Sequence, residues 1–298
     1  GSNEKILTQR SFEEKLAQHE EEVRAARTVV MIQCVGSRDE KRPFCSRICC
    51  TEAIKNALKL KEINSEVNIY ILYRDIRTYG FNELYYKEAR EKGVIFVRYE
   101  VDRKPEVNVE DGEIMVGMFD EILNREILLN PDYLILSAGI HPRSDCEELA
   151  AKLKLPLNAD KFFLEAHMKL RPLDFSNEGF FMAGLAHSPK FINESIAQAR
   201  GTAARAATII SNDKRYVGGA VSVVNQDQCA ACLTCVRECP FHVPAITEEG
   251  VAYIEPAACQ GCGICASACP RKAIDVQHYK DNQIIAKCEI LYDQREAV

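Results

Sequence analysis

The chain has 298 residues, enough for two or three domains, and its 47% hydrophobic and 28% charged residues are ordinary for a globular protein. A formal net charge of −6 gives no reason to expect nucleic acid or an anionic membrane as a partner. No apolar run approaches the roughly 18–20 residues of a membrane span, and no signal-like segment precedes the first polar helix, so we expect a cytoplasmic protein.

The 14 cysteines are the most informative part of the composition. Twelve of them lie in three tight groups, and only Cys146 and Cys288 stand apart. Disulfide scaffolds are usually too short to build a core, whereas this chain has ample apolar residues, so metal ligation is favoured over disulfides. We expect Cys146 to be a free thiol and Cys288 to be a core or half-buried residue.

The N-terminal part of the chain alternates predicted helices and strands. Residues 4–27 are charged and helix-prone, and we expect them to form a connecting helix. A β-α-β-α-β order follows, which predicts a parallel sheet with helices on its faces. The predicted strands are 28–33, 67–73 and 94–100, and the predicted helices are 51–62 and 81–93.

The middle of the chain contains a predicted hairpin and two strand-to-glycine segments. Residues 105–136 are predicted to form a β-ribbon and a strand, because Asp111-Gly112 separates two alternating segments. The buried strand in DYLILSAGIHP (132–142) runs into a small-residue turn, and GFFMAGLAHSP (179–189) repeats that pattern. Residues 191–210, rich in Ala and Gly, predict a long helix.

After a boundary at Gly218-Gly219, the sequence carries an internal repeat. CAACLTCVRECP (229–240) and CQGCGICASACP (259–270) are both C-x2-C-x2-C-x3-C-P, the spacing of bacterial two-cluster ferredoxins. A pair of structural zinc sites is the alternative, but two complete runs that end in Cys-Pro favour iron–sulfur clusters. The expected ligands are Cys229, Cys232, Cys235 and Cys269 for one [4Fe–4S] cluster, and Cys259, Cys262, Cys265 and Cys239 for the other.

The segment CVGSRDEKRPFCSRICC (34–50) lies where a nucleotide-binding fold would place a glycine-rich phosphate loop, between a predicted strand and a predicted helix. Its cysteines are spaced C-x10-C-x3-C-C, which is not the ferredoxin pattern, but four thiols suit a tetrathiolate site. On spacing alone an iron–sulfur cluster is favoured, and a zinc ion or buried reduced thiols stay open. The candidate ligands are Cys34, Cys45, Cys49 and Cys50.

Longer motifs accompany these cysteines: QCVGSRDE, FCSRICC, the Ala-Ile-Lys that ends at Lys55, DIRTYG, FFLEAHMKLRP and FMAGLAHSPKFINESIAQA. Together they resemble the A subunits of heterodisulfide reductases and related subunits of flavin-based electron-bifurcating complexes in anaerobes. The resemblance runs from roughly Ile6 to the C-terminus. It implies a thioredoxin-reductase-like fold that has lost its pyridine-nucleotide site, which agrees with the absence of G-x-G-x-x-G at 34–50. It also implies that the four cysteines of 34–50 ligate a [4Fe–4S] cluster next to FAD.

The same resemblance gives roles to five further residues. On a helical wheel Lys55 falls opposite the apolar stripe, which favours a solvated lysine, but in the family its counterpart lies near the reactive flavin nitrogen and would stabilise reduced, anionic flavin. GFFMAGLAHSP resembles the late FAD motif of disulfide-reductase-like flavoproteins, although Leu185 stands where many of them have Asp. A tightly packed core helix is the alternative interpretation of 191–210. The expected FAD-binding residues are Gly184, Leu185, Ser195 and Ile196.

The expected architecture is an α/β, thioredoxin-reductase-like (Rossmann-type) module followed by an α+β 2[4Fe–4S] ferredoxin domain. The family's first FAD segment is expected upstream of residue 1, either in a longer polypeptide or supplied by another chain. The expected divisions are a linker at 1–27, a nucleotide-binding-like domain with a [4Fe–4S] site at 28–138, the second part of an FAD-binding domain at 139–216 and a ferredoxin domain at 217–298.

The expected function is that of an electron-transfer subunit of a heterodisulfide-reductase-like complex. It would pass electrons between FAD, the cluster at 34–50 and two ferredoxin clusters, as part of flavin-based electron bifurcation. The alternative is a flavin-free electron carrier or docking module with no catalysis of its own. Expected partners are the other subunits of such a complex and a soluble ferredoxin, with a homodimer as an alternative; nucleic acid and a membrane are not expected.

Overall fold

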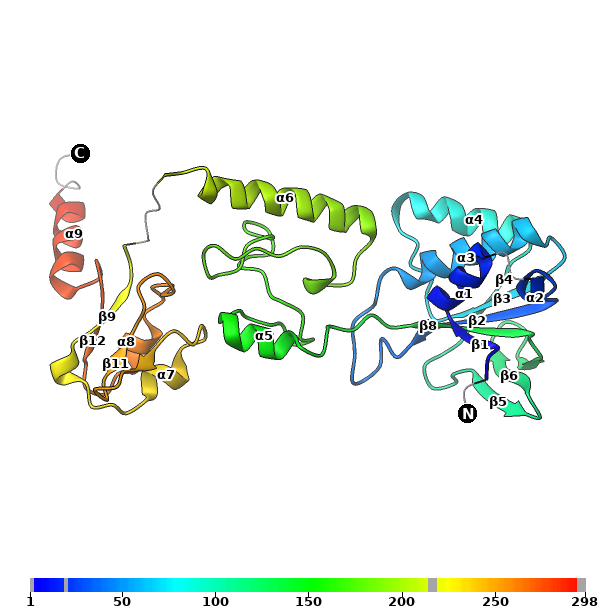
Figure 1. The fold of residues 1–298 in the computed structure, drawn as a ribbon, viewed down its shortest axis with the longest axis horizontal. Helices are drawn as coiled ribbons and strands as arrows, with labels where there is room; N and C mark the ends of the chain where they lie inside the picture. The colour runs from blue at the N-terminus through cyan, green and yellow to red at the C-terminus, as the bar shows by residue number, and fades with distance from the viewer. Residues whose placement is uncertain (1–2, 19–20, 214–218, 294–298) are drawn as a thin grey trace. The chain divides into compact units, whose positions relative to one another are not determined.

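The computed structural model describes residues 3–18, 21–213 and 219–293 (Figure 1). The chain divides into two compact units, one of residues 1–141 with 189–191 and the other of residues 142–188 with 192–298. Gly218, half of the expected boundary, lies outside the described residues. The four finer divisions expected from the sequence stay predictions.

The first unit is built on a five-stranded sheet in which every neighbouring pair is parallel. Buried side chains such as Val29, Met31 and Ile71 fill its strands, as expected for a parallel sheet that is covered on both faces. The α/β class predicted from the alternating pattern is confirmed. In sheet order the strands are β1 (Ile6–Thr8), β8 (Tyr133–Ala138), β2 (Thr28–Val35), β3 (Asn68–Tyr73) and β4 (Ile95–Arg98).

Helices cover one face of this sheet. The apolar stripe of α3, with Ala53, Ile54 and Ala57, packs in one core with Phe12 of α1 and with Met31 of the sheet. This core supports the turn that carries the N-terminal cysteines, since α3 begins at Cys49. The helices of the unit are α1 (Gln9–Ala17), α2 (Glu21–Arg24), α3 (Cys49–Ile63), α4 (Glu83–Glu91) and the 3-10 turn η1 (Gly80–Asn82).

An antiparallel three-stranded sheet covers the other face. Ile114, Val116 and Met118 alternate along its central strand and share a core with Val30 and Leu134 of the parallel sheet. The expectation of helices on both faces is therefore wrong on this side, because a period-2 ribbon supplies the apolar cover. The predicted hairpin is confirmed. The strands are β5 (Glu106–Glu110), β6 (Glu113–Asp120) and β7 (Arg125–Leu129).

The N-terminal segment is not a simple connecting helix as expected. Its first residues form β1, which pairs with β8 at the edge of the parallel sheet through Ile6 opposite Leu134. Thr8 then caps α1 by accepting a hydrogen bond from the Ser11 amide. The strand was missed because an edge strand of three residues is too short to show a period-2 pattern.

Residues 142–213 contain two helices and little regular strand. Phe163, Phe175 and Met182 pack around α5 in a small core with Cys146, which is a free thiol as expected. The strand predicted within GFFMAGLAHSP (179–189) is wrong, since Phe181 forms only an isolated bridge with Asp174. The elements are α5 (Cys146–Leu153), the 3-10 turn η2 (Gly184–Ala186) and α6 (Ile192–Ile210).

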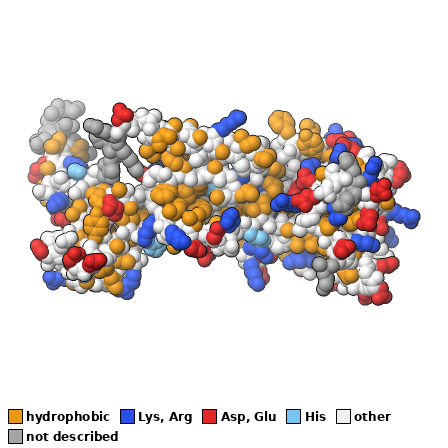
Figure 2. Space-filling view, in the orientation of Figure 1, with side chains coloured by type: hydrophobic (Ala, Val, Ile, Leu, Met, Phe, Trp, Pro, Cys, Tyr) orange, Lys and Arg blue, Asp and Glu red, His pale blue; other side chains and the backbone are white. Residues whose placement is uncertain are grey.

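Helix α6 is confirmed as a long helix, but it buries none of its side chains against the described part of the chain. Ile192, Ile196 and Ile210 are among its exposed apolar residues, and Figure 2 shows hydrophobic side chains gathered along it. The helix passes close to Leu173 at Gly201, where an added Cβ would lie 2.6 Å from the Leu173 Cδ1. The alternative of a tightly packed core helix is not what this chain shows by itself.

The C-terminal domain consists of very short elements. Two antiparallel strand pairs, β9 with β12 and β10 with β11, enclose two five-residue helices. Its small core includes the side chains of Cys235 and Cys265 themselves. The elements are β9 (Ser222–Val224), η3 (Gln226–Gln228), α7 (Thr234–Glu238), β10 (Ala245–Ile246), β11 (Ala252–Tyr253), α8 (Ile264–Ala268), β12 (Ile274–Val276) and α9 (Asp281–Asp293).

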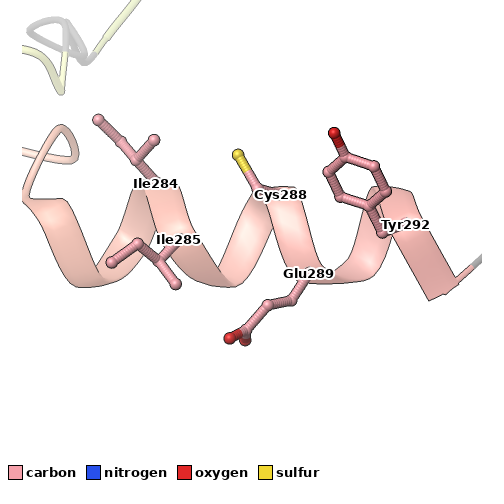
Figure 3. Close-up of a pocket in the computed structure, with 5 residues that line it drawn as sticks. All are labelled: Ile284, Ile285, Cys288, Glu289 and Tyr292. Atoms are coloured by element: carbon pink, nitrogen blue, oxygen red, sulfur yellow. The ribbon is translucent and has the colours of Figure 1, made fainter.

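Helix α9 presents Cys288 to solvent, so the expectation of a core or half-buried residue is wrong. Figure 3 shows Ile284, Cys288 and Tyr292 along one side of the helix, with Ile285 and Glu289 pointing away from them. Apolar residues at such spacing suggested burial, yet all of these apolar side chains are exposed in the described structure.

Among the described residues, no helix combines the length and apolar character needed to cross a bilayer.

Candidate metal centres and flavin site

The two cysteine runs of the C-terminal domain are related by a constant offset of 30 residues, and the backbone repeats with the sequence. Equivalent residues adopt the left-handed conformation (φ of +51° to +76°), which bends each run around a common centre. Because non-glycine residues adopt this conformation at a cost, its recurrence indicates a geometry imposed by function. The equivalent pairs are Ala231 and Gly261, Leu233 and Gly263, and His242 and Lys272.

Two small cavities lie inside these bends. Each is lined by three cysteines of one run and by the last cysteine of the other run. The first cavity is lined by Cys229, Cys232, Cys235 and Cys269, and the second by Cys259, Cys262, Cys265 and Cys239. These sets coincide with the two interleaved ligand sets expected from the sequence.

Backbone amides point at the sulfur atoms of both runs. The amide of Ala252 donates to Cys229 Sγ at 3.4 Å, and the amide of Ser222 donates to Cys259 Sγ at the same distance. Cys269 Sγ accepts from the Ala273 amide at 3.3 Å. Soft thiolate ligands and amide donors are what an iron–sulfur cluster requires, so the residues present fit this cofactor.

Burial and exposure divide the thiols of this domain. Burial raises the pKa of Cys235 and of Cys265, while a hydrogen bond with Thr234 lowers the pKa of the exposed Cys232. Buried thiols resist ionisation unless a cation compensates the charge. The ferric and ferrous ions of a bound cluster would supply that compensation.

The N-terminal site begins at a break in strand β2. Cys34 adopts a left-handed conformation (φ 61°), and the register between β2 and β8 shifts between Ile32 and Val35. Such a bulge redirects the side chain away from the regular alternation. Cys45 lies in the following loop, where its Sγ accepts from the Arg47 amide at 3.3 Å, and α3 then begins with Cys49.

The four N-terminal thiols are close enough to affect one another's ionisation. Burial, together with the neighbouring thiols of Cys50, Cys45 and Cys34, raises the pKa of Cys49 to about 12. The pKa of Cys50 is raised to about 11 by burial, with Cys34 and Cys45 contributing. Strand end, loop and helix start thus bring the four thiols near one another, and the thiols of Cys49 and Cys50 are far from ionised without a metal.

Arg38 is one of the cations near these thiols, together with Arg74 and Arg77. Its guanidinium donates to Cys34 Sγ at 3.9 Å and pairs with Asp75 at 2.6 Å, and its side chain is only 14% exposed. Burial raises the pKa of Cys34, and the charge of Arg38 opposes that rise. A fixed arginine beside one ligand stabilises negative charge on the thiols.

Two buried polar side chains near these cysteines lack a hydrogen-bond partner among the described residues. The Gln33 amide is 0% exposed, and neither its Oε1 nor its Nε2 is paired; Thr51 Oγ1 in the first turn of α3 is also unpaired. Buried polar groups without a partner are rare and costly. Gln33 directly precedes Cys34, so these orphaned atoms fit a site that holds a further group.

Within the described ranges, no three His, Cys, Asp or Glu side chains are arranged to hold a single metal ion.

Lys55 lies on the exposed side of α3, where it is 51% exposed and pairs with Glu13 at 2.6 Å. Both interpretations of this lysine therefore remain predictions.

The expected flavin residues lie at the start of α6 and in the turn before it. Gly184 (φ 70°) donates its amide to Gln198 Oε1 at 2.9 Å, and Gln198 in turn contacts His187 at 3.1 Å. Leu185 and Ile196 are each about half exposed, and Ser195 is partly buried. The four expected positions are thus neighbours in space, but the Gly184 amide is already engaged.

Sequence reasoning missed three residues that shape these sites: Arg38, Gln198 and Ser222. Arg38 could not have been found from spacing, because its partner Asp75 is distant in the chain. Gln198 could not either, because its partners Gly184 and His187 lie in the turn before the helix. Ser222 could have been found, since the 30-residue offset of the ferredoxin repeat makes it equivalent to Ala252.

Fold and cysteine geometry together define an α/β module joined to an iron–sulfur domain, and residues 228–274 match the family model described as a 4Fe-4S dicluster domain. The chain is 35% identical to the A subunit of the ferredoxin:CoB-CoM heterodisulfide reductase of Methanosarcina acetivorans, over 91% of this chain and 34% of that protein. It is 39% identical to the iron-sulfur A subunit of the CoB–CoM heterodisulfide reductase of Methanocaldococcus jannaschii, over 87% of this chain and 40% of that protein. The chain is therefore similar to heterodisulfide reductase A subunits, as the motifs indicated, and it spans 34–40% of the length of these two relatives.

Solved structures offer more distant likenesses. A thioredoxin reductase of T. acidophilum matches with 16% identity and a TM-score of 0.48, over 71% of this chain and 59% of that one. A thioredoxin reductase of Lactococcus lactis matches with 18% identity and a TM-score of 0.40, over 61% and 51%. The α/β class itself rests on the strand order of this chain.

Proposed function

We propose that this chain is an electron-transfer subunit of a heterodisulfide-reductase-like oxidoreductase, with three [4Fe–4S] clusters and a contribution to an FAD site. The observation that carries the proposal is the lining of the two C-terminal cavities, each by three cysteines of one run and one of the other. Iron–sulfur clusters exchange single electrons, and FAD converts between two-electron and one-electron transfer.

In this proposal the chain's own residues bind and insulate the redox groups. The eight C-terminal cysteines hold two clusters whose sulfurs are hydrogen-bonded by amides such as those of Ala252 and Ala273. Cys34, Cys45, Cys49 and Cys50 hold a third cluster beside Arg38. The core around α3 keeps water from Cys49 and Cys50.

The wider role follows from the relatives. Proteins named as heterodisulfide reductase subunits work in complexes, so we propose other subunits and a soluble ferredoxin as electron partners. The assembled complex would divide electron pairs between a disulfide-like acceptor and low-potential ferredoxin. Lys55, when released from Glu13, would face a reduced flavin.

Iron and acid-labile sulfide analysis of the anaerobically purified chain tests the cluster content. About twelve irons per chain are expected for three cubanes. About eight irons, with zinc present, would show that the N-terminal site is not a cluster. The variant Cys49→Ser should lower the content by about four irons while leaving the ferredoxin clusters, whereas Cys288→Ser, on exposed α9, should change nothing.

A flavin-free electron carrier is the second candidate, and two observations favour it. The Gly184 amide is engaged by Gln198, and α6 lacks burial in the described chain, so the half-site as it stands offers little to FAD. Absorption spectra before and after denaturation separate the candidates. Flavin bands released on denaturation support the flavoprotein, and cluster absorption alone supports the carrier.

A further inference from the structure

The two halves of the ferredoxin domain can be compared position by position. In the strand pair β9–β12 Ser222 lies opposite Val276, and in the pair β10–β11 Ala252 lies opposite Ile246. Shifting either pair by 30 residues gives the other, so Ser222 and Ala252 occupy equivalent positions. Both side chains are buried, at 1% and 2% exposed, and each residue lines one of the two cavities.

The backbones of these two positions make the same interaction. Each amide donates to the first cysteine of a run at 3.4 Å, Ser222 to Cys259 and Ala252 to Cys229. The main-chain hydrogen bonds at these two positions are therefore the same in both cavities. Any difference between the sites at this position must come from the side chains.

The side chains differ by one hydroxyl group. Ser222 Oγ lies 3.3 Å from Cys265 Sγ, and both residues are buried. Ala252 offers no hydroxyl to Cys235, the equivalent cysteine of the first cavity. A thiolate bound to iron carries no proton, so the Ser222 hydroxyl must be the donor when a cluster is present.

We propose that Ser222 is a tuning residue that raises the reduction potential of the cluster held by Cys239, Cys259, Cys262 and Cys265. Reduction adds one electron, from the neighbouring cluster or an external one-electron donor, and makes the cluster one unit more negative with no proton transferred. A buried hydroxyl that donates to a ligand sulfur stabilises the more negative state. The inference rests on the proposed function, since it requires clusters in both cavities.

Other differences between the cavities should also affect the two reduction potentials, but they are independent of the hydroxyl at residue 222. Arg271 lines the first cavity where Phe241 lines the second, and a cation there favours the reduced state of the first cluster. Thr234 lies 3.4 Å from Cys232, but that cysteine is exposed and water competes for its sulfur. Exchanging only residues 222 and 252 leaves these features unchanged.

The test is a redox titration of the full, iron-loaded chain, followed by electron paramagnetic resonance, for three variants. Ser222→Ala should lower one midpoint potential, Ala252→Ser should raise the other, and the double variant should do both. The hydrogen bond is present in both oxidation states, so only the difference in its strength counts, and we expect about a three- to tenfold change in the ratio of reduced to oxidised cluster at fixed potential. A tenfold change is about 59 mV for one electron.

Iron analysis of every variant separates the two possible failures. A wild-type chain without ferredoxin clusters would overturn both the proposed function and this inference. Clusters at full content whose midpoints do not move in Ser222→Ala would overturn the inference alone, as would a change of the same signal by both single variants. Should Ser222→Ala fail to load iron, Ala252→Ser decides, because an unmoved midpoint in that variant contradicts the tuning role.

Discussion

The two cysteine-rich regions differ in what holds their surroundings together. The N-terminal cysteines lie on the rim of a parallel sheet whose two cores, as described, contain none of them. The C-terminal domain has strands of two or three residues around its cysteines, and Cys235 and Cys265 are part of its core. Elements this short are not stable alone. A cluster at the N-terminal site would therefore be added to a fold that is stable without it, whereas clusters in the C-terminal domain would be part of what stabilises its fold.

This comparison is tested most strongly by removing one ligand from each region. Cys235→Ser should unfold the C-terminal domain and make it roughly tenfold or more sensitive to protease, because binding free energy is folding free energy there. Cys49→Ser should leave residues 21–213 as protected as in the wild-type chain. Limited proteolysis with mass spectrometry measures both. Equal protection of the C-terminal domain in both variants would contradict the comparison.

Within the C-terminal domain, the repeat provides a matched pair of backbone variants. An added Cβ at Gly261 would lie 2.1 Å from the Ala220 carbonyl oxygen, at a φ of 64°. We expect Gly261→Ala to destabilise the iron-loaded domain by about 2–4 kcal/mol. The equivalent exchange Ala231→Gly, at φ 52°, should change stability by under about 1 kcal/mol. Thermal loss of cluster absorbance compares them, and similar midpoints would argue against a tight fit at Gly261.

At the N-terminal site, the stability effect of Gln33 should distinguish the iron-free chain from the iron-loaded one. Since its buried amide has no partner among the described residues, Gln33→Met should stabilise the iron-free chain by about 1–3 kcal/mol. The gain should shrink or reverse in the iron-loaded chain if the cluster or its ligands pair with the amide. Urea unfolding of both forms measures this difference. A gain of equal size in the two forms would exclude Gln33 from the loaded site.

The smallest expected effect concerns Thr234 at the rim of the first cavity. Thr234→Val removes a hydroxyl 3.4 Å from the sulfur of the exposed Cys232. Because water can replace this hydrogen bond, the first cluster's midpoint should fall by less than the second cluster's does in Ser222→Ala. The same redox titration compares them. A larger midpoint shift in Thr234→Val than in Ser222→Ala would contradict the expectation that a buried hydroxyl has the greater effect.

Local patterns were enough for much of this protein. The β-α-β-α-β order, the Asp111-Gly112 hairpin and the long helix at 191–210 are all confirmed, because each depends on periodicity or turn chemistry within a few residues. The spacing of the two C-terminal runs also predicted which cysteines line each cavity. Spacing worked there because three cysteines of each set lie close along the chain, and the internal repeat indicates the fourth.

Tertiary structure decided what depends on partners distant in sequence. It placed an antiparallel ribbon, rather than helices, on one face of the sheet, and it left α6 and Cys288 uncovered. The sequence by itself determined the cysteine spacings, the repeat and the order of the elements. Only the fold brought Asp75 to Arg38 and the Ser222 hydroxyl to Cys265, because burial and charge at a site depend on the surrounding space rather than on the neighbouring residues in the chain.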